Sequence, residues 1–435
     1  MNEIEQMDQQ YVFGTWSFQK NVHPKQIVAA EGVYFTDAEG RRYLDFSSQL
    51  MCSQLGHKNE RLNRAIQAQA SKFAYIAPGF TCEARAKLGK KLAEITPGDL
   101  CKTFFSPGGT EAIEAALMIA RWFTGKQKII SRYRSYHGST CGSIALTGDP
   151  RRWATEPAIP GILKAPDPYE YRTVFGSVMK TLDYIDEMLT LEGDTVAAVI
   201  VEPVVGSNGI LVPPPEYLPE LLRICHKHGA LLIADEVMSG FGRCGEWFAC
   251  DLWEVVPDIM AVAKGITAAY LPLAGTIVNE EIAAHFNDNF FNLGHTYSGH
   301  PMTVAAALET IQIYEDEQLI PAAKRKGNYL LDKLRQLQAR HPCVGEVRGV
   351  GLFCGVELVK DRKTKEPFDE YGVKVKGGPS VLAQATGKAL AGGVYMVGMI
   401  NTLIIAPPLI ISEAQIDEGL RGLDQALSWV DTLVD

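Results

Sequence analysis

The chain has 435 residues, of which 46% are hydrophobic and 21% charged, a composition that is typical of a globular protein and excludes a disordered chain. Its 42 basic residues against 51 acidic ones give a net charge of −9, which disfavours a protein that holds nucleic acid or an anionic membrane surface. No apolar run approaches the ~20 residues that cross a bilayer. The nine cysteines are scattered, without a C-x-x-C pair, and the first residues are polar, so we expect no metal site and a cytoplasmic location.

Three parts of the chain differ in their pattern. Residues 1–59 contain a predicted hairpin over residues 31–46. Residues 60–320 alternate helical periodicity with short, nearly continuous apolar strands, which is typical of a buried, mostly parallel sheet. Residues 321–435 change to an α+β pattern. We therefore predict an α/β protein with a large central domain and a small α+β domain built from both chain ends.

Helices and strands are expected to alternate through the large domain. Its helices include Thr110–Phe123 and Tyr217–His228. In the small domain we expect a long helix at Ala322–Arg340, a helical stretch at 379–392 and a last helix from Ser412. The strands predicted for the large domain are Lys128–Ser131, Ser143–Thr147, Val196–Val201, Leu231–Ala234, Ile259–Ala263 and Leu273–Val278.

Glu202, Asp235 and Lys264 each follow a predicted strand, at intervals of about one βαβ unit. Ligands of open α/β sheets bind beyond the carboxyl ends of the strands, so we expect the three side chains to converge. An acidic residue at such a place is as often only a cap for the next helix. A lysine after the apolar run IMAVA needs another reason, because buried lysines are rare. A partly desolvated lysine beside Ala263 and Gly265 would have a lowered pKa and could act as an amine nucleophile in Schiff-base chemistry.

Two further patterns suggest a ligand. Gly108, Gly109 and Thr110 precede a predicted helix, whose free N–H groups and dipole can hold a phosphate. Such a Gly-Gly pair usually marks only a turn, and the G-x-x-x-x-G-K-[ST] spacing of a P-loop is absent. Tyr136 places an aromatic ring after the first predicted strand, although most tyrosines serve only packing. Together, a lysine, a carboxylate, a phosphate cup and an aromatic ring match the needs of pyridoxal 5′-phosphate (PLP).

The chain resembles class III PLP-dependent aminotransferases, the ω-aminotransferase group, over essentially its whole length. The order and spacing of several runs make the match specific. These runs are SPGGTEA (106–112), YHG (136–138), EPV (202–204), ADEVMSGFGRCG (234–245), PDIMAVAKGI (257–266), HTYSGHP (295–301), RGVGLF (348–353) and APPLI (406–410).

The resemblance implies the PLP-dependent transferase fold type I and a homodimer, or a tetramer built from it, with active sites shared between subunits. It implies that Lys264 holds the cofactor's aldehyde and moves protons at the substrate α-position, while Asp235 keeps the pyridine nitrogen protonated. Trp16 falls where the family has an aromatic residue of the substrate pocket. The other implied cofactor-binding residues are Gly108, Gly109 and Thr110 at the phosphate, Tyr136 and Val237 on the two ring faces, Glu202 behind the ring, and Thr296 at the phosphate of the partner's cofactor.

The departures from the family pattern concern the substrate. Members that use glutamate typically carry an Arg after Y-H-G and another before A-P-P-L, the second paired with a Glu after E-P-V. Here Ser139 and Ser207 occupy two of these places, and the stretch before A-P-P-L has no arginine. We therefore expect an ω-amine donor such as taurine or β-alanine, with a 2-oxo acid such as pyruvate or 2-oxoglutarate as acceptor. Arg151, Arg152 and Arg172 are candidates for the acceptor's carboxylate by charge alone.

Two alternatives stay open at this point. An aminomutase, racemase or decarboxylase could use the same fold and cofactor, because a proton-moving lysine serves all of these reactions. A non-catalytic PLP-binding protein is the other alternative. It would be expected to lack Lys264 or to carry an added DNA-binding segment, and the sequence shows neither.

Overall fold

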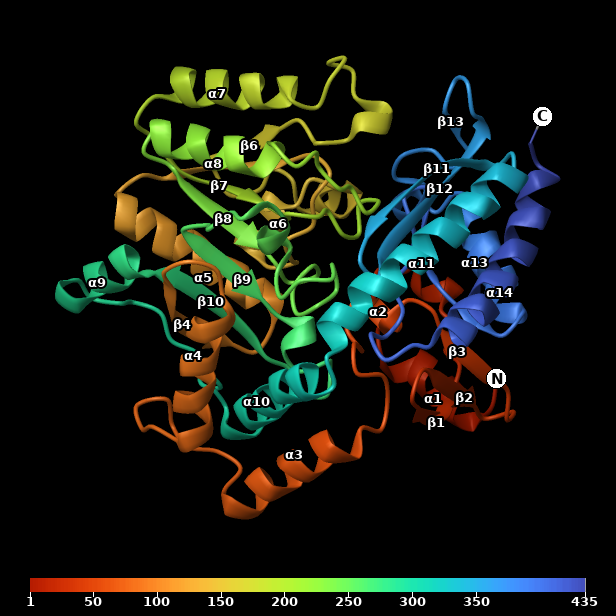
Figure 1. Cartoon of the computed structure of the whole chain (residues 1–435), viewed down its shortest axis with the longest axis horizontal. Coiled ribbons are helices and arrows are strands. Elements are labelled where there is room, and N and C mark those ends of the chain that lie inside the picture. Colours follow the sequence, from red (N-terminus) through yellow and green to blue (C-terminus); the bar gives the residue numbers. More distant parts are fainter. Residues whose placement is uncertain (435) are drawn as a thin grey trace.

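A seven-stranded sheet in the order β4-β10-β9-β8-β7-β5-β6 carries the large lobe of the computed structural model, which describes residues 1–434 (Figure 1). β10 runs antiparallel to both of its neighbours, and the pairs from β9 to β6 are parallel. The mostly parallel sheet predicted from the sequence is therefore confirmed. The strands are β4 (Leu100–Ser106), β5 (Lys128–Arg132), β6 (Ile162–Ala165), β7 (Val196–Val201), β8 (Leu231–Asp235), β9 (Ile259–Val262) and β10 (Ala274–Asn279).

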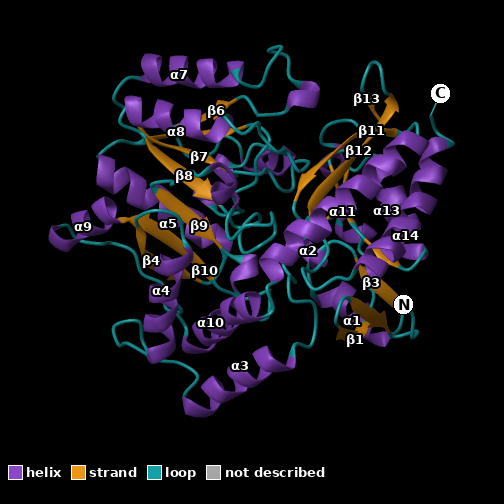
Figure 2. Ribbon diagram, in the orientation of Figure 1, coloured by secondary structure: helices purple, strands orange, loops and turns teal. Residues whose placement is uncertain are grey.

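Helices cover both faces of this sheet, which is why its central strands are almost wholly apolar (Figure 2). Successive residues of β7 point to opposite sides: Ile200 packs in the core under α5, and Val199 in the core under α7 and α8. The helices of this lobe are α3 (Glu60–Lys72), α4 (Glu83–Ile95), α5 (Gly109–Thr124), α6 (Cys141–Leu146), α7 (Lys180–Glu192), α8 (Tyr217–Lys227), α9 (Glu280–Asp288) and α10 (Pro301–Asp316).

One predicted strand is wrong. Ser143–Thr147 was expected to be extended, but the chain forms α6 there, because a short apolar run has no period that separates a strand from a buried helix. The Glu114 carboxylate accepts hydrogen bonds from the backbone N–H groups of Gly142 and Ser143, at 2.8 and 2.9 Å, and so caps the helix. Strands β4 and β6, which the sequence did not reveal, complete the sheet.

The small lobe combines both chain ends, as expected (Figure 1). β14 pairs in parallel with β3, so that Val394 lies opposite Leu44 and joins the two ends in one sheet. The domain boundaries at residues 59/60 and 320/321 stay predictions. The elements are α1 (Glu3–Tyr11), β1 (Ile27–Glu31), β2 (Tyr34–Asp37), β3 (Arg42–Asp45), α2 (Ser48–Met51), α11 (Leu319–Arg340), β11 (Val344–Val350), β12 (Phe353–Asp361), β13 (Glu366–Pro367), α12 (Val373–Lys376), α13 (Val381–Ala391), β14 (Val394–Tyr395), β15 (Val397–Met399), β16 (Thr402–Ile405) and α14 (Glu413–Asp431).

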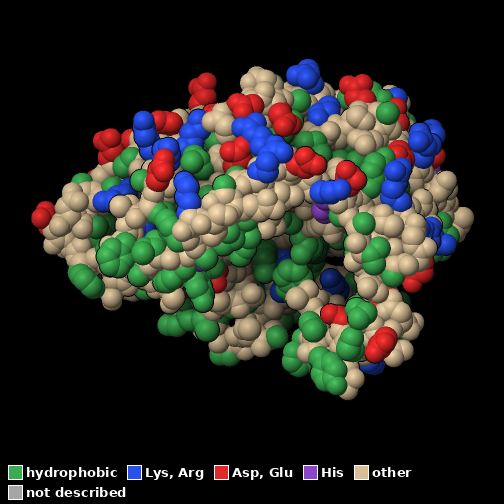
Figure 3. All heavy atoms as spheres, turned by 90° about the horizontal axis from the view of Figure 1, so that it is seen from below, with side chains coloured by type: hydrophobic (Ala, Val, Ile, Leu, Met, Phe, Trp, Pro, Cys, Tyr) green, Lys and Arg blue, Asp and Glu red, His purple; other side chains and the backbone are tan. Residues whose placement is uncertain are grey.

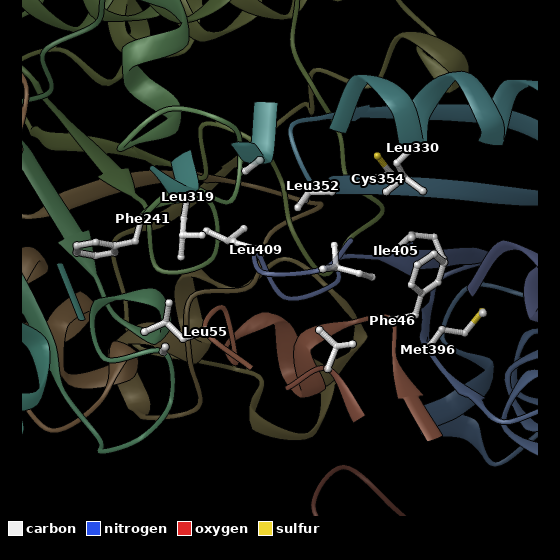
Figure 4. Close-up of a cluster of buried hydrophobic side chains, with 14 of the residues drawn as sticks. Phe46, Leu55, Phe241, Leu319, Leu330, Leu352, Cys354, Met396, Ile405 and Leu409 are labelled. Carbon is white, nitrogen blue, oxygen red and sulfur yellow. The ribbon is translucent and has the colours of Figure 1, made fainter. Parts of the chain in front are cut away.

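One buried apolar cluster runs through both lobes (Figure 4). It joins Phe46 and Leu55 of the N-terminal segment, Phe241 of the large lobe, and Leu330 and Ile405 of the small lobe. This shared core fixes the two lobes against each other beside the carboxyl ends of the parallel strands. Within residues 1–434 no helix has the length and apolar character needed to cross a membrane. The cytoplasmic location stays a prediction.

Candidate active site

A cavity of about 450 Å³ opens at the carboxyl edge of the seven-stranded sheet. The strand register brings the three predicted ionisable groups to this edge, since Val201 pairs with Ala234 and Asp235 with Ala261. Trp16 and Thr296 are not among its lining residues. The predicted residues that line it are Gly108, Gly109, Thr110, Tyr136, Glu202, Asp235, Val237 and Lys264.

Lys264 begins a short 3₁₀ turn (Lys264–Ile266), which Ala263 separates from the end of β9. Its backbone φ of 48° lies in the left-handed region, a strained conformation for a residue with a side chain and one that is common at functional sites. Burial lowers the pKa of its amine, and the nearby Asp235 carboxylate opposes this shift. Within residues 1–434 the Nζ atom has no hydrogen-bond partner. The amine is therefore available in the cavity.

Asp235 is held from two sides. Its Oδ1 accepts the N–H of Val237 at 3.0 Å, and its Oδ2 lies 2.7 Å from Nδ1 of His137. His137 is buried, and its Nε2 has no partner within residues 1–434. The sequence motif Y-H-G contains His137, yet nothing in the sequence pointed to its contact with Asp235. This pair fixes the orientation of the Asp235 carboxylate, which lines the cavity together with Lys264.

Glu202 lines the cavity and holds two neighbouring loops in place. Its two carboxylate oxygens accept backbone N–H groups of Tyr136 at 3.0 Å and Gly206 at 2.8 Å. Burial raises the pKa of this carboxyl, and the two N–H groups counteract the shift. Glu202 therefore ties two loops together at the carboxyl end of β7.

The N-terminus of α5 forms a cradle with no room for additional side chains. Gly108 is the N-cap, and a Cβ atom on Gly109 would lie 3.1 Å from a methyl group of Val237. A Cβ atom on Gly138, whose φ is +140°, would lie 2.5 Å from the hydroxyl of Thr110. The first N–H groups of the helix lack helical partners and carry the positive end of its dipole. This cradle suits a small anion such as a phosphate.

Trp16, Tyr136 and Arg151 form the rim of the cavity. The edge of the Trp16 ring meets Tyr136 at a centroid distance of 6.3 Å. The Arg151 guanidinium lies 3.6 Å from the Tyr136 ring centroid and 5.6 Å from that of Trp16. The rim therefore places a cation on the aromatic rings that flank the cavity.

Hydrogen bonds fix the direction of Arg151, which belongs to a 3₁₀ turn at Pro150–Thr155. Its Nε donates to both oxygens of Asp149 at 3.0 Å, and its Nη2 donates to the Ser207 hydroxyl at 3.0 Å. Ser207 lines the cavity. The other two arginines proposed by charge point elsewhere. Arg152 pairs with Glu156 at 2.7 Å and Arg172 with Glu357 at 2.6 Å.

Thr296 lies outside this cavity, on an exposed stretch of chain. Its carbonyl oxygen accepts the hydroxyl of Tyr75 at 2.9 Å. The role implied for Thr296, at the cofactor phosphate of a partner subunit, stays a prediction.

The chemistry of this site fits PLP. It offers an unpaired amine, an oriented carboxylate, a helix N-terminus for a phosphate, and the Tyr136 ring and Val237 side chain for the two faces of a pyridine ring.

Comparison with known proteins agrees with this fit. The family model "Aminotransferase class-III" matches residues 17–427. The taurine–pyruvate aminotransferase of Bilophila wadsworthia is 35% identical over 460 residues, covering 99% of this chain and 98% of that protein. A leucine/methionine racemase of Thermococcus litoralis is 36% identical, covering 94% of this chain and 91% of that protein.

A solved structure gives the same result. The taurine:2-oxoglutarate aminotransferase of Bifidobacterium kashiwanohense, in complex with PLP and glutamate, matches with a TM-score of 0.95 and 38% identity, covering 99% of this chain and 98% of that chain. Fold type I and the α/β prediction are thereby confirmed. The family match and the geometry of the cavity lead to one conclusion: the chain belongs to the class III aminotransferases, a family of PLP-dependent enzymes.

Proposed function

We propose that this aminotransferase takes the amino group from an ω-amine that carries an acidic group, such as taurine or β-alanine. The acceptor is a 2-oxo acid such as pyruvate or 2-oxoglutarate. The observation that supports this most is the place of Arg151, an oriented cation at the rim of a cavity that contains a free lysine amine. The similarity to taurine aminotransferases that use pyruvate or 2-oxoglutarate points the same way.

The residues at the cavity divide the work of binding the cofactor. The N-terminus of α5, with Gly108, Gly109 and Thr110, would hold the phosphate, and Asp235 would accept the N–H of the pyridinium ring. Tyr136 and Val237 would contact its two faces. When bound, PLP supplies the electron sink that acidifies the proton on the amine-bearing carbon.

Lys264 would perform two tasks. Its amine would hold the cofactor aldehyde in the resting enzyme, and it would then move a proton from the amine-bearing carbon of the donor. The pKa of Lys264, lowered by burial, keeps more of the amine in the neutral form that can accept a proton. The reverse transfer, to the carbon that receives the amino group, would use the same atom in the second half of the cycle.

Arg151 would bind the acidic group of the donor and, in the second half-reaction, a carboxylate of the acceptor. Within residues 1–434 its Nη1 has no hydrogen-bond partner, so the guanidinium can still donate to an anion. Ser207 stands where glutamate-using relatives carry a Glu, and its hydroxyl accepts from Arg151. A hydroxyl orients the cation without neutralising it, whereas a carboxylate at this place would compete with the substrate.

We further propose that two copies of the chain share the site, as the family resemblance implies. On the face seen in Figure 3, hydrophobic side chains gather around a hollow. Exposed aromatic residues of the chain include Phe80 at 64% and Tyr297 at 60%, and the Tyr75 and Tyr297 rings lie 6.1 Å apart beside Thr296. Such a cluster is costly in water and is typical of a subunit interface.

The half-reaction with the amine donor alone tests the proposal. Taurine, β-alanine and 4-aminobutyrate should convert the enzyme-bound aldehyde to the amine form. The loss of the visible absorbance of the aldehyde form measures this conversion. Diamines and α-amino acids serve as the comparison and should react more slowly. Conversion by α-amino acids alone would show that the ω-amine assignment is wrong.

A racemase is the second candidate, because one relative of similar identity is a leucine/methionine racemase. A racemase needs the same proton-moving lysine but returns the proton to the carbon from which it came. With an α-amino acid in D₂O, it would exchange the α-proton without accumulating the amine form. The aminotransferase proposal predicts the opposite: the amine form accumulates in a stoichiometric amount.

A further inference from the structure

The stretch of chain that begins with Lys264 is strained. Lys264, Ala268 and Ala269 have φ angles of 48°, 47° and 65°, in the left-handed region that favours glycine. The main-chain hydrogen bonds of this stretch are long. The Lys264 carbonyl accepts the N–H groups of Thr267 and Ala269, both at 3.3 Å, and the Gly265 carbonyl accepts that of Ala268 at 3.2 Å. Such a backbone keeps its conformation only where the surrounding structure holds it.

Tyr314 of α10 supplies a shorter bond to this stretch. Its hydroxyl lies 2.7 Å from the carbonyl oxygen of Gly265, the residue after Lys264. The Tyr314 residue is 1% exposed, and its ring meets that of Trp247 edge-on at a centroid distance of 6.3 Å. Burial raises the pKa of the hydroxyl, which therefore stays a donor throughout the neutral pH range. Tyr314 is not among the residues that line the cavity, so it acts on Lys264 through the main chain.

Gln54 packs against the same peptide. A Cβ atom on Gly265 would overlap the Gln54 amide. The Nε2 of Gln54 donates to the carbonyl of Gly240 at 3.2 Å, and its Oε1 lies 2.7 Å from the Tyr314 hydroxyl. This hydroxyl has one proton and two acceptors, so it donates to one of them at a time. Tyr314 and Gln54 therefore enclose the peptide that follows Lys264.

We propose that Tyr314 is a positioning residue, which holds the Gly265 carbonyl and thereby orients the Lys264 amine towards the cofactor aldehyde. The φ and ψ angles of Lys264 set the direction of its Cα–Cβ bond, so a turn that relaxes would displace Nζ. Without the hydroxyl, the buried carbonyl loses a donor and the left-handed turn loses a restraint. This inference rests on the proposed function, in which the Lys264 amine holds the cofactor aldehyde in the resting enzyme.

Binding of two forms of the cofactor to the cofactor-free, full-length protein tests the proposal without turnover. PLP can bond to Lys264, whereas pyridoxamine 5′-phosphate carries an amine in place of the aldehyde and cannot. Tyr314→Phe removes only the hydroxyl. The affinity for PLP should fall about tenfold in this variant, and the affinity for pyridoxamine 5′-phosphate should stay within about twofold of the wild-type value. The second affinity also shows that the variant is folded and that its phosphate cradle is intact.

The half-reaction with the amine donor gives a second measurement. At saturating donor, the absorbance of the aldehyde form should disappear about tenfold more slowly in Tyr314→Phe. The donor concentration that gives half of the maximal rate should change less than about twofold. Deuterium on the amine-bearing carbon of the donor should slow the variant more than the wild type, because a displaced amine makes the proton transfer more strongly rate-limiting.

Two variants serve as controls. Tyr43→Phe removes another buried hydroxyl, which donates to Asp37 at 2.6 Å in the small lobe. It should leave both affinities and the half-reaction within about twofold of the wild-type values. Gln54→Met keeps the length of the side chain and leaves Gly265 as the acceptor of the Tyr314 hydroxyl, so the ratio of the two affinities should change less than about threefold.

The proposal is overturned if Tyr314→Phe weakens PLP and pyridoxamine 5′-phosphate equally, since an equal loss indicates a general disturbance of the fold. An unchanged ratio in Tyr314→Phe also overturns it. So does an equal change of the ratio in Gln54→Met, which would assign the effect to the packing of the amide.

Lys264→Ala separates this inference from the proposed function, and the binding measurement does not depend on which amine is the donor. Lys264→Ala should lower the affinity for PLP relative to pyridoxamine 5′-phosphate more than Tyr314→Phe does. If Lys264→Ala lowers this ratio and Tyr314→Phe does not, only the role of Tyr314 is wrong. If Lys264→Ala leaves the ratio unchanged, the role of Lys264 in the proposed function is itself wrong.

Discussion

The floor and the rim of the cavity are held by different kinds of bond. The floor consists of Glu202, Asp235, Lys264 and the N-terminus of α5, all at one edge of one sheet. Its carboxylates accept backbone N–H groups, as Glu202 does from Tyr136 and Gly206. The rim comes from distant parts of the chain, and its contacts are made by side chains: Arg151 lies on the Tyr136 ring and bonds to the Ser207 hydroxyl.

This difference separates the reaction from the substrate. Main-chain bonds at a sheet edge depend on the fold and tolerate little change, so they keep Lys264 and Asp235 in a fixed relation. Side-chain contacts at the rim can be exchanged one residue at a time without disturbing the sheet. A family that keeps the residues of the floor and varies those of the rim can therefore keep one cofactor chemistry while its members use different donors and acceptors.

Lys264→Ala should have the largest effect, because it removes the reactive group of the floor and leaves the rim intact. We expect turnover to fall by about 10⁴-fold or more, since the variant lacks the proton-moving amine. The absorbance of the lysine-bound cofactor should disappear as well. Lys264→Arg, which keeps the charge but not the nucleophile, should lose the same absorbance. Turnover at the wild-type rate in either variant would contradict the assignment.

Glu236→Gln tests how the buried carboxyl next to Asp235 affects the stability of the protein at different pH values. Glu236 follows Asp235, is fully buried, and has a pKa that burial raises to about 7. Between pH ~4.5 and ~7 the unfolded chain loses this proton and the folded chain keeps it, so the carboxyl lowers stability as the pH rises through this window. The loss amounts to about 3 kcal/mol above pH ~7.

The Gln variant can still accept the N–H of Cys250, which donates to Glu236 at 2.8 Å. It should therefore be the more stable protein at pH ~8, and its unfolding free energy should vary less between pH ~5 and ~7. Chemical denaturation at a series of pH values measures both. Parallel pH profiles for the two proteins would show that Glu236 is ionised throughout.

Arg151→Gln changes the rim and leaves the floor bonds in place. A lost hydrogen bond between charged groups costs about 1.5–3 kcal/mol, so kcat/KM for taurine or β-alanine should fall roughly 10–150-fold. The loss should be much smaller for an aliphatic amine that has no acidic group. Steady-state kinetics with both donor types decide this. An equal loss for both donors would mean that Arg151 supports the floor instead.

Trp16→Ala should have the smallest effect. The Trp16 ring is 44% exposed and meets Tyr136 edge-on, an arrangement worth about 0.5–1.5 kcal/mol. We expect kcat/KM for the acidic ω-amines to fall by a few-fold to about tenfold, and Trp16→Phe should restore most of it. A loss as large as that of Arg151→Gln would make Trp16 a direct contact of the substrate.

The residues of the floor could be predicted from the sequence because each lies at the carboxyl end of a strand or just beyond it. Val196–Val201 was predicted at both ends, so the place of Glu202 followed from counting along the chain. Asp235, predicted just beyond a strand, is the last residue of β8. The helix α6 escaped prediction because Glu114, which caps it, lies on another helix. Short-range patterns contain no signal for such a contact.

Which of the candidate arginines belongs to the rim escaped prediction for the same physical reason. Arg151 and Arg152 are neighbours of identical charge, and only the folded chain shows that one reaches Ser207 and the other Glu156. His137 was visible in its motif, but its contact with Asp235 joins a loop to the end of β8, and these segments are far apart in the chain.

The reversed direction of β10 has a consequence for motion. Because β10 is antiparallel to β9, the chain returns along the neighbouring strand after Lys264, and Thr267, Leu271 and Leu273 of this connection line the cavity. Lys264 thus stands at the bend of a hairpin whose arms are hydrogen-bonded to each other, while β8 anchors one arm beside Asp235. A displacement of the small lobe that admits or releases a substrate would leave this hairpin in register. The small lobe can therefore move to admit a substrate while Lys264 and Asp235 keep their positions relative to each other.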